Sequence, residues 1–367
     1  MGRPHGSLGL GLHDVPTPSL VVDLDAFEAN CVTLAGAMSA AGVGWRPHVK
    51  GHKSPRLART MIDAGAIGVT CAKVSEAEEM VAAGVGEVLI ANQPSTRSAW
   101  DRLARLNRAA WVAAAVDSAD HVRFATEAGR SYETSIPLVI EVDIGMNRAG
   151  VRSAGQAVDL AREIDRSEAT FAGVMGYEGH LLTVWPLLEK TSRITDAIGT
   201  LIAARDAIEQ AGIAVGIVSC GGSGSYGISS RIDGVTEIQA GGGCLMDRFY
   251  RESCHVDLEQ ALFVVGSVAS RPQADVAILD TGWKALPSRT AQPYPRDHDD
   301  MVVAQVFAEH LRLERTDGTD IDLAVADRIV FVPGYSDETT VLHDEFLGVR
   351  DGVVVETIPL AARGALQ

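Results

Sequence analysis

Short apolar runs alternate with longer amphipathic segments between residues 43 and 243 of this 367-residue chain. The runs are nearly continuous in apolar residues, which is typical of strands buried on both faces of a parallel sheet. Helix-like segments such as 75–85 and 190–212 separate them, and eight such units predict a closed (β/α)8 TIM-type barrel. A doubly wound open sheet is the alternative architecture. The predicted strands are 43–49, 67–72, 87–92, 110–116, 136–145, 170–179, 215–222 and 236–243.

The pattern changes after about residue 250, where short β-like runs follow one another with few helical segments between them. We therefore predict an α/β protein of two domains. The barrel takes residues 24–248, and an antiparallel β domain takes residues 249–367 together with about residues 8–23. The runs that define the β domain are 261–272, 274–282, 301–314, 328–333 and 353–361.

Composition limits the partners of the chain. The net charge is -16, and no long basic run relieves it, so nucleic acid and membrane surfaces are excluded as partners. An anionic ligand must then be bound locally, by loop amides, helix N-termini or a few placed cations. The N-terminal stretch lacks an apolar signal core, and the five cysteines form no CxxC pair. We expect a cytoplasmic protein with buried free thiols.

Polar or glycine-rich residues follow nearly every predicted barrel strand. Barrel enzymes carry their active sites at the C-terminal ends of the strands, where these residues meet. We therefore predict the functional site at this end of the barrel. The residues concerned are Lys50 and His52, Lys73 and Ser75, Asn92, Asn147 and Arg148, and Tyr177 and His180.

Two glycine-rich loops follow the last two predicted strands. Small residues there let backbone N–H groups approach phosphate oxygens, so these loops predict a phosphate site, with plain tight turns as the alternative. Residues 222–227 also match the GxGxxG dinucleotide fingerprint, but the motif lies late in the chain and no long helix follows it. The residues of the two loops are Gly221, Gly222 and Ser223, and Gly241, Gly242 and Gly243.

A phosphate site would explain the cluster of basic residues around Lys50, at the end of the first predicted strand. A lysine held on a rigid strand end can be desolvated and form a Schiff base with an aldehyde. Arg148 can donate hydrogen bonds to a phenolate oxygen, and Tyr177 or His180 can flank a flat ring. Together these residues indicate a pocket for pyridoxal 5'-phosphate, an aldehyde that carries a phosphate.

Motifs along nearly the whole chain resemble the D-threonine aldolase and D-serine dehydratase family, which are alanine-racemase-like, fold-type III pyridoxal phosphate enzymes. The resemblance implies a barrel with a C-terminal β domain and a homodimer whose sites are completed by the partner's β domain. It also implies that Lys50 is the Schiff-base lysine, that the glycine loops with Ser223 hold the phosphate, and that Arg148 and Tyr177 contact the ring system. The motifs are "RPHVKGHKS", "GVTCAKVSEAEEM", "DIGMNRAGV", "GYEGHL", "GGSGSYGISSRIDGVTEIQAGG" and "DTGWKAL".

The resemblance places two metal ligands near the C-terminus, as His-x-Asp in the aldolases or His-x-Cys in the dehydratases. In "VPGYSDETTVLHD", Asp337 retains the carboxylate, Tyr335 replaces the histidine, and His343 is out of register. A phenol is a poor ligand for manganese, magnesium or zinc, so we expect weak metal binding or none. Lys50, His52, Tyr335 and Asp337 are the predicted catalytic residues.

The predicted function is that of a lyase that cleaves D-configured β-hydroxy-α-amino acids to glycine and an aldehyde. A D-serine dehydratase-like deaminase and an amino-acid racemase are alternatives, because they use the same cofactor. A further alternative is a non-catalytic pyridoxal phosphate-binding protein, against which the extra β domain argues. The pair Glu309 and His310 resembles a Glu-His step in the β domain of these aldolases and is a candidate to shape the partner's site.

Overall fold

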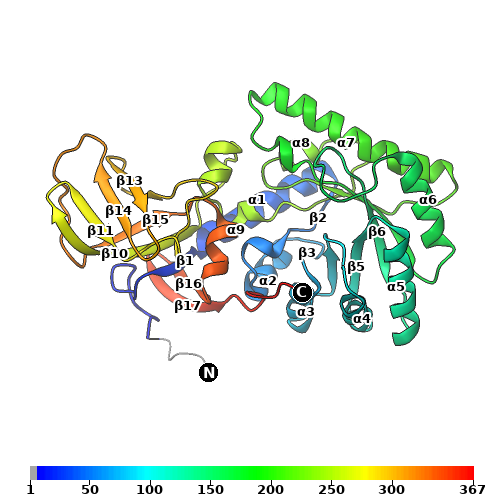
Figure 1. Ribbon diagram of the computed structural model, residues 1–367, viewed down its shortest axis with the longest axis horizontal. Coiled ribbons are helices and arrows are strands. Elements are labelled where there is room, and N and C mark those ends of the chain that lie inside the picture. Colours follow the sequence, from blue (N-terminus) through cyan, green and yellow to red (C-terminus); the bar gives the residue numbers. More distant parts are fainter. Residues whose placement is uncertain (1–5) are drawn as a thin grey trace. The chain divides into compact units, whose positions relative to one another are not determined.

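The computed structural model describes residues 6–367, and these divide into two units of different architecture (Figure 1). The barrel unit consists of Val32–Gly241 with Gly364–Gln367, and the β unit consists of the chain up to Cys31 with Gly242–Arg363. The boundary near the N-terminus falls inside helix α1 (Leu24–Ala41).

Eight parallel strands form the sheet of the barrel unit, in the order β2-β9-β8-β7-β6-β5-β4-β3. A parallel bridge between His48 and Thr70 joins the two outer strands, and the Thr70 N–H donates to the Pro47 carbonyl at 2.8 Å. The predicted closed barrel is therefore confirmed, and the open-sheet alternative is wrong. The strands are β2 (Gly44–Trp45), β3 (Val69–Cys71), β4 (Glu87–Ile90), β5 (Trp111–Val116), β6 (Pro137–Glu141), β7 (Thr170–Met175), β8 (Ile217–Cys220) and β9 (Glu237–Ile238).

Helices cover the outside of these strands (Figure 1), and local sequence signals start several of them. Pro55 occupies the first turn of α2, where its missing N–H costs nothing. Side-chain oxygens of Thr96 and Ser153 accept hydrogen bonds from backbone N–H groups at the starts of α4 and α6. The predicted helical segments 75–85 and 190–212 correspond to α3 and α7. The helices are α2 (Pro55–Asp63), α3 (Val74–Ala82), α4 (Arg97–Leu106), α5 (Ala119–Tyr132), α6 (Ala154–Asp165), α7 (Leu187–Gln210) and α8 (Tyr226–Ser229).

The inward-facing side chains of the strands differ between the two halves of the barrel. Along β4 to β7, alternate residues form an apolar cluster, as the two-residue period of a strand requires. Along β2, β8 and β9 the corresponding residues are polar. The apolar cluster contains Leu89, Ala91, Ala113, Ala115, Val139 and Met175.

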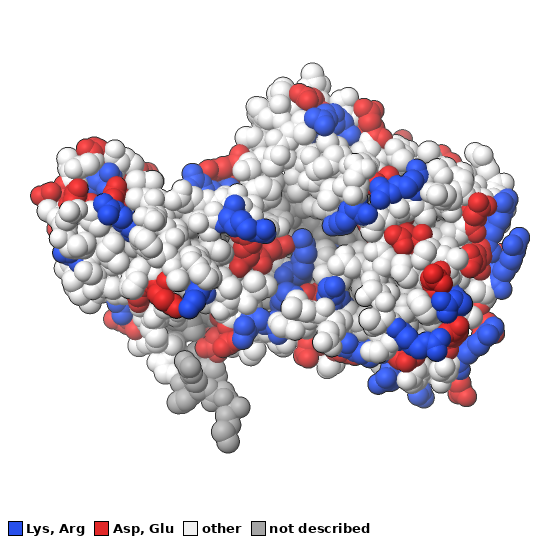
Figure 2. Space-filling model, viewed as in Figure 1, with Lys and Arg blue, Asp and Glu red and all other residues white. Residues whose placement is uncertain are grey.

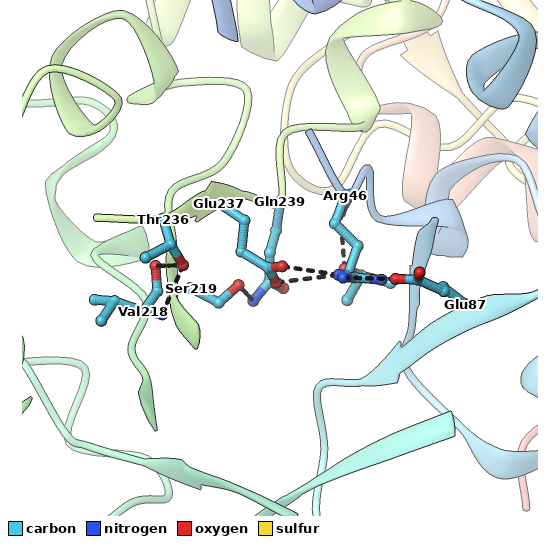
Figure 3. Close-up of polar contacts among 8 residues, drawn as sticks. Arg46, Glu87, Val218, Ser219, Thr236, Glu237 and Gln239 are labelled. Carbon is cyan, nitrogen blue, oxygen red and sulfur yellow. Dashed lines mark hydrogen bonds and ion pairs between the residues drawn. The ribbon is translucent and has the colours of Figure 1, made fainter. Parts of the chain in front are cut away.

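A buried ion pair joins the two shortest strands of the barrel (Figure 3). The Arg46 Nε donates to both carboxylate oxygens of Glu237, at 3.1 and 3.0 Å, and each residue is only 3% exposed. Gln239 extends this polar seam by donating from its Nε2 to the Ser219 Oγ at 2.9 Å. Backbone hydrogen bonds from the Gly44, Arg46 and His48 N–H groups to the Thr236, Ile238 and Gln239 carbonyls join the same two segments. The side-chain contacts therefore add to a regular backbone pairing.

The β unit is a nine-stranded, mainly antiparallel sheet in which β1 pairs antiparallel with β10 and parallel with β16. The predicted run 301–314 is two strands, β13 and β14, because the Phe307 N–H donates to the His310 carbonyl at 2.8 Å and turns the chain. Strands β12 and β16 were missed by the sequence pattern. The strands are β1 (Ser19–Asp23), β10 (Leu262–Gln273), β11 (Val276–Leu279), β12 (Tyr294–Pro295), β13 (Met301–Val306), β14 (Leu311–Arg315), β15 (Arg328–Val332), β16 (Glu345–Arg350) and β17 (Val353–Pro359).

The core of the β unit lies on one face of this sheet. Strands near both ends of the chain contribute side chains to it. A short helix, α9 (Ser336–Thr339), follows β15. The core cluster contains Val15, Val21, Phe263, Val265, Val332, Leu347, Val349 and Val354.

All five cysteines are buried, and none forms a disulfide. Burial raises the pKa of the Cys71, Cys220 and Cys244 thiols well above the usual range, so these thiols stay protonated. Within residues 6–367, no helix has the length and apolar character that a membrane crossing requires. On the face of the molecule in Figure 2, basic and acidic side chains are interspersed, and that face has no continuous basic surface.

Removal of one partner of the buried ion pair should destabilise the protein strongly. We expect Arg46→Met to lower the free energy of unfolding by about 3–5 kcal/mol, because Glu237 then stays buried without its cation. The double variant Arg46→Met/Glu237→Leu should recover part of this loss. Urea unfolding measures both, and Arg130→Met, which breaks an exposed pair with Glu168, is the matched control and should change little. Equal effects of Arg46→Met and Arg130→Met would contradict the prediction.

Candidate functional site

Lys50 lies in a short 3-10 turn, Val49–Gly51, directly after the end of β2. The Nδ1 of His48 accepts a hydrogen bond from the Lys50 N–H at 3.3 Å, and the His48 N–H donates to the Gln239 carbonyl at 3.0 Å. Burial, assisted by Lys50 and Lys53, holds the pKa of His48 well below its usual range. The imidazole is therefore neutral and able to accept, and the backbone of Lys50 is fixed beside the end of β9.

A second buried ion pair holds the far side of the Lys50 turn. The Lys53 Nζ pairs with the Glu76 carboxylate, and the two residues are 5% and 1% exposed. The Glu76 Oε2 also accepts from the Ala72 N–H at 2.6 Å and from the Lys73 N–H at 3.3 Å. One carboxylate thus joins the end of β3 to the turn after β2. Neither Lys53 nor Glu76 was predicted from the sequence, although an acid three residues after a helix N-cap is a capping signal.

His52 serves the same turn, because its Nδ1 accepts from the Ser54 N–H at 3.1 Å and its side chain is nearly fully buried. Its predicted catalytic role stays a prediction. Lys73 and Asn92, two other predicted strand-end residues, line a pocket of about 490 Å³ beside the ends of β3 and β4. Gln93 lines the same pocket.

Arg148 lies in the loop after β6 and is half-exposed, with its Nη2 3.6 Å from the Glu141 carboxylate. Glu141 ends β6 and accepts a hydrogen bond from the Gln93 Nε2 at 2.5 Å. Burial raises the pKa of Glu141, and the contacts with Gln93 and Arg148 counteract this shift. The carboxylate therefore orients Arg148 toward the strand ends. Neither Glu141 nor Gln93 was singled out from the sequence.

The loop after β7 places Tyr177 and His180 against neighbouring glycines. A Cβ at Gly222 would lie 3.0 Å from the Tyr177 Cε2, and one at Gly145 would lie 2.6 Å from the His180 Nε2. Both distances are shorter than ordinary packing contacts, so the absence of a Cβ at these glycines lets the two rings approach the loop backbone closely. The structure therefore brings Tyr177 to the loop after β8, while His180 lies against the loop after β6.

The glycine loops of the barrel unit are shaped by close backbone approach. Gly221 has a φ of +78°, and a Cβ at Gly241 would lie 2.2 Å from the His48 carbonyl oxygen. Ser223, which follows Gly222 in the first loop, is buried, with an exposed fraction of 3%. Helix α8, which follows the first loop, has only four residues, so the dinucleotide alternative lacks the long helix that it needs.

Gly242 and Gly243 begin the β unit, in a 3-10 turn that ends at Cys244. A Cβ at Gly242 would lie 2.7 Å from the Tyr250 Oη, so the absence of a side chain here lets Tyr250 pack closely on this turn. Tyr250 and Phe249 in turn contact Tyr335, with ring centroids 6.0 and 5.3 Å away from its ring. This aromatic cluster fixes the ring of Tyr335.

Tyr335 and Asp337 lie at the start of α9, where the Tyr335 Oη donates to the Asp337 Oδ2 at 3.0 Å. The His343 side chain is engaged elsewhere, because its Nε2 forms a hydrogen bond with the Ala285 carbonyl oxygen at 2.8 Å. Across residues 6–367, no group of three or more His, Cys, Asp or Glu side chains is arranged to hold a metal ion. A single carboxylate already bonded to a phenol is a poor fit to a divalent cation.

Glu309 and His310 lie in the exposed turn between β13 and β14, and Glu309 pairs with the Lys284 ammonium. Their role toward a partner subunit stays a prediction.

Asp247 anchors the segment that carries Tyr335 and Asp337. It is fully buried, its Oδ1 accepts from the Tyr250 N–H at 2.9 Å, and its Oδ2 accepts from the Ser336 N–H at 2.7 Å. Burial raises the pKa of Asp247 to about 7, although both hydrogen bonds favour the ionised form. The sequence analysis did not identify this residue as an anchor.

The raised pKa of Asp247 should make stability depend on pH. The folded protein holds this proton more tightly than the unfolded chain, in which an aspartate has a pKa of about 3.9. The stabilisation is full below that value and is lost as pH rises through the folded pKa of about 7. We expect Asp247→Asn to flatten the dependence of the unfolding temperature of the apoprotein on pH across this window. Asp257→Asn, at a fully exposed aspartate, is the control, and parallel profiles for wild type and Asp247→Asn would contradict the expectation.

Comparison with known proteins gives consistent matches over the whole chain. The family "Alanine racemase, N-terminal domain" matches residues 22–248, and "Putative serine dehydratase domain" matches residues 261–349. A 3-hydroxy-D-aspartate aldolase of Paracoccus denitrificans (strain Pd 1222) is 33% identical, over 97% of this chain and 94% of its own. A D-threonine aldolase of an Arthrobacter species is 32% identical, over 98% of this chain and 96% of its own.

A solved structure of D-threonine aldolase from Filomicrobium marinum superposes with a TM-score of 0.94. Its sequence is 33% identical, and the match covers 99% of this chain and 100% of the other. The predicted family is confirmed by these matches. The chain belongs to the alanine-racemase-like enzymes that include the D-threonine and 3-hydroxy-D-aspartate aldolases.

Proposed function

We propose that this protein is a pyridoxal 5'-phosphate-dependent lyase that cleaves D-configured β-hydroxy-α-amino acids to glycine and an aldehyde. The observation that carries the proposal is the barrel end itself. Lys50 lies in the turn directly after β2, the loop after β9 approaches the His48 backbone at Gly241, and the loop after β8 lies against Tyr177 at Gly222. The names of the relatives support the same reaction class.

The residues of the barrel unit fit the cofactor. A Cβ at Gly222 or Gly241 would fill the space beside Tyr177 or the His48 backbone, so these loops keep backbone close to the site. When bound, the cofactor withdraws electrons from the bonds around the substrate's α-carbon. Lys50 would hold it covalently, and the loop amides would bind its phosphate. Tyr177 would flank its ring.

Arg148 supplies the cation for the phenolate oxygen of the cofactor. Its guanidinium is held by Glu141, whose position depends in turn on Gln93. A guanidinium remains charged at all working pH values, so the contact does not depend on a titration near neutrality. The phenolate is thereby kept anionic.

Cleavage of the Cα–Cβ bond requires that the β-hydroxyl of the substrate lose a proton. By their places in the family we assign Tyr335 and Asp337 to this oxygen. The Tyr335 hydroxyl already donates to Asp337, so the pair offers one proton and two oxygens that exchange hydrogen bonds with an alcohol. The donor set does not fit a divalent metal, and no step is derived through one.

Dehydration is the second candidate, because the C-terminal match to a putative serine dehydratase domain covers residues 261–349. It differs from cleavage in the bond that breaks, since the β-hydroxyl leaves and a keto acid and ammonia form. Racemisation remains a further alternative from the sequence, whereas membership in a family of aldolases argues against a non-catalytic carrier. The homodimer and the cytoplasmic location also stay predictions.

Product analysis distinguishes these functions. We expect D-threonine to yield glycine and acetaldehyde, and the L isomer to yield neither. Lys50→Ala should form no product while its unfolding temperature shows that it is folded. Pyruvate and ammonia from D-serine would indicate the dehydratase, L-alanine from D-alanine the racemase, and no product from any of the three a carrier.

The departure at the family's metal position leads to a further prediction. Elemental analysis should find no stoichiometric manganese, magnesium or zinc, and a chelator should leave activity unchanged. Tyr335→Phe should lower kcat on the order of a hundredfold, because the proton acceptor or donor for the β-oxygen is lost. Tyr132→Phe, at a tyrosine that stacks on Arg105 at the end of α5, is the matched control. Tightly held metal, chelator-sensitive activity and a harmless Tyr335→Phe would show the assignment to be wrong.

A further inference from the structure

A fully buried carboxylate lies directly beneath the first glycine loop. Glu178 follows Tyr177 after β7, and its side chain is 0% exposed. Its Oε1 accepts hydrogen bonds from the Ser225 Oγ at 2.7 Å and the Ser229 Oγ at 2.5 Å. Its Oε2 accepts from the Gly221 N–H at 3.3 Å. All three donors belong to the loop after β8 or to the short helix that follows it.

The contact with Ser225 continues to the backbone of the loop. The Ser225 Oγ accepts from the Gly222 N–H at 3.0 Å while it donates to Glu178. The N–H groups of Ser225 and Tyr226 donate back to the Gly222 carbonyl, at 3.0 and 2.9 Å. Glu178 therefore determines the orientation of the Gly222 peptide through one hydroxyl.

The neighbours of Glu178 hold the loop from the other side. The ring of Tyr177 packs so closely on Gly179 and Gly222 that a Cβ at these glycines would lie 2.4 and 3.0 Å from it. Two consecutive residues after β7, Tyr177 and Glu178, thus confine the loop, the first by its ring and the second by its carboxylate. The conformation of this loop is set by the preceding strand end and not by the loop alone.

We propose that Glu178 is the positioning residue that holds the loop Gly221–Ser225 in its phosphate-binding conformation. This proposal rests on the proposed function and deepens it. A negative charge beside a phosphate site opposes phosphate binding electrostatically, so the contribution of Glu178 has to be geometric. Only a carboxylate can accept from two hydroxyls and one amide while donating nothing, whereas a glutamine amide turns two hydrogens toward these donors.

Glu178→Gln should therefore weaken binding of the phosphate group selectively. We expect the Kd for pyridoxal 5'-phosphate to rise about tenfold to a hundredfold, since one buried donor of the loop loses its acceptor. The Kd for pyridoxal, which lacks the phosphate, should change little. Absorbance titration of the apoprotein with each compound measures both constants without reference to turnover. Borohydride reduction of the wild-type complex, followed by peptide mapping, first places the pyridoxyl group on Lys50.

Ser225→Ala is a second variant that tests the same link if Glu178→Gln does not fold. It should reproduce the selective loss, and the double variant should be no worse than Glu178→Gln alone, because the two side chains act in series. Ser230→Ala, one residue past the end of α8, is the matched control and should bind both compounds as wild type does.

The outcomes separate this inference from the proposed function. If wild type prefers the phosphorylated compound and both variants keep that preference, the role of Glu178 is overturned while the function stands. An equal loss of affinity for both compounds also overturns it, since it shows general destabilisation. If wild type has no such preference or labels a lysine other than Lys50, the inference falls together with the proposed function.

Discussion

The buried pair of Arg46 and Glu237 is the interaction on which the catalytic end of the barrel depends. It joins the ends of β2 and β9, which are two residues long, and adds a buried ion pair to the backbone hydrogen bonds between these segments. With this seam closed, the chain after β2 passes the end of β9 so closely that the His48 carbonyl leaves no room for a Cβ at Gly241. The turn that carries Lys50 begins one residue later. A break in the seam would therefore disturb the placement of the lysine as well as the stability of the barrel.

Buried carboxylates recur beneath the functional loops of this barrel end. Glu76 holds the turn after β2 through Lys53, Glu141 holds Arg148, and Glu178 holds the loop Gly221–Ser225 through hydroxyl and amide donors. Glu141 ends β6, Glu178 lies in the segment after β7, and Glu76 lies in the first turn of α3, soon after the end of β3. Irregular backbone has unpaired N–H groups, and a carboxylate can satisfy several of them at once. The loops are thus ordered before any ligand arrives, which lowers the entropic cost of binding.

The β unit also contains a buried carboxylate, Asp247, that accepts hydrogen bonds from a neighbouring segment, but here the pKa of the carboxylate is raised to about 7. Burial causes this rise, although two backbone amides donate to the carboxylate. The segment that it anchors includes Tyr335 and Asp337, which form a hydrogen bond with each other. Asp337 retains the carboxylate of the family's metal position, and Tyr335 stands where the resemblance leads us to expect a histidine. The rings of Phe249 and Tyr250 pack against the ring of Tyr335.

The sequence pattern predicted the eight barrel strands and the change to a β unit, because strands buried on both faces are continuous apolar runs. It also predicted the glycine loops, because backbone that must approach other groups closely is rich in glycine. Lys50 and Arg148 were predicted from their places after strands. The sequence did not predict the buried carboxylates Glu76, Glu141, Glu178 and Asp247, because the identity of an acidic residue does not tell whether its side chain is buried. The role of such a carboxylate depends on hydrogen-bond donors that are distant in sequence. For Glu178 these include Ser225 and Ser229, which lie 47 and 51 residues away. Strands β12 and β16 were missed for a related reason, since their pairing partners, not their own short sequences, make them strands.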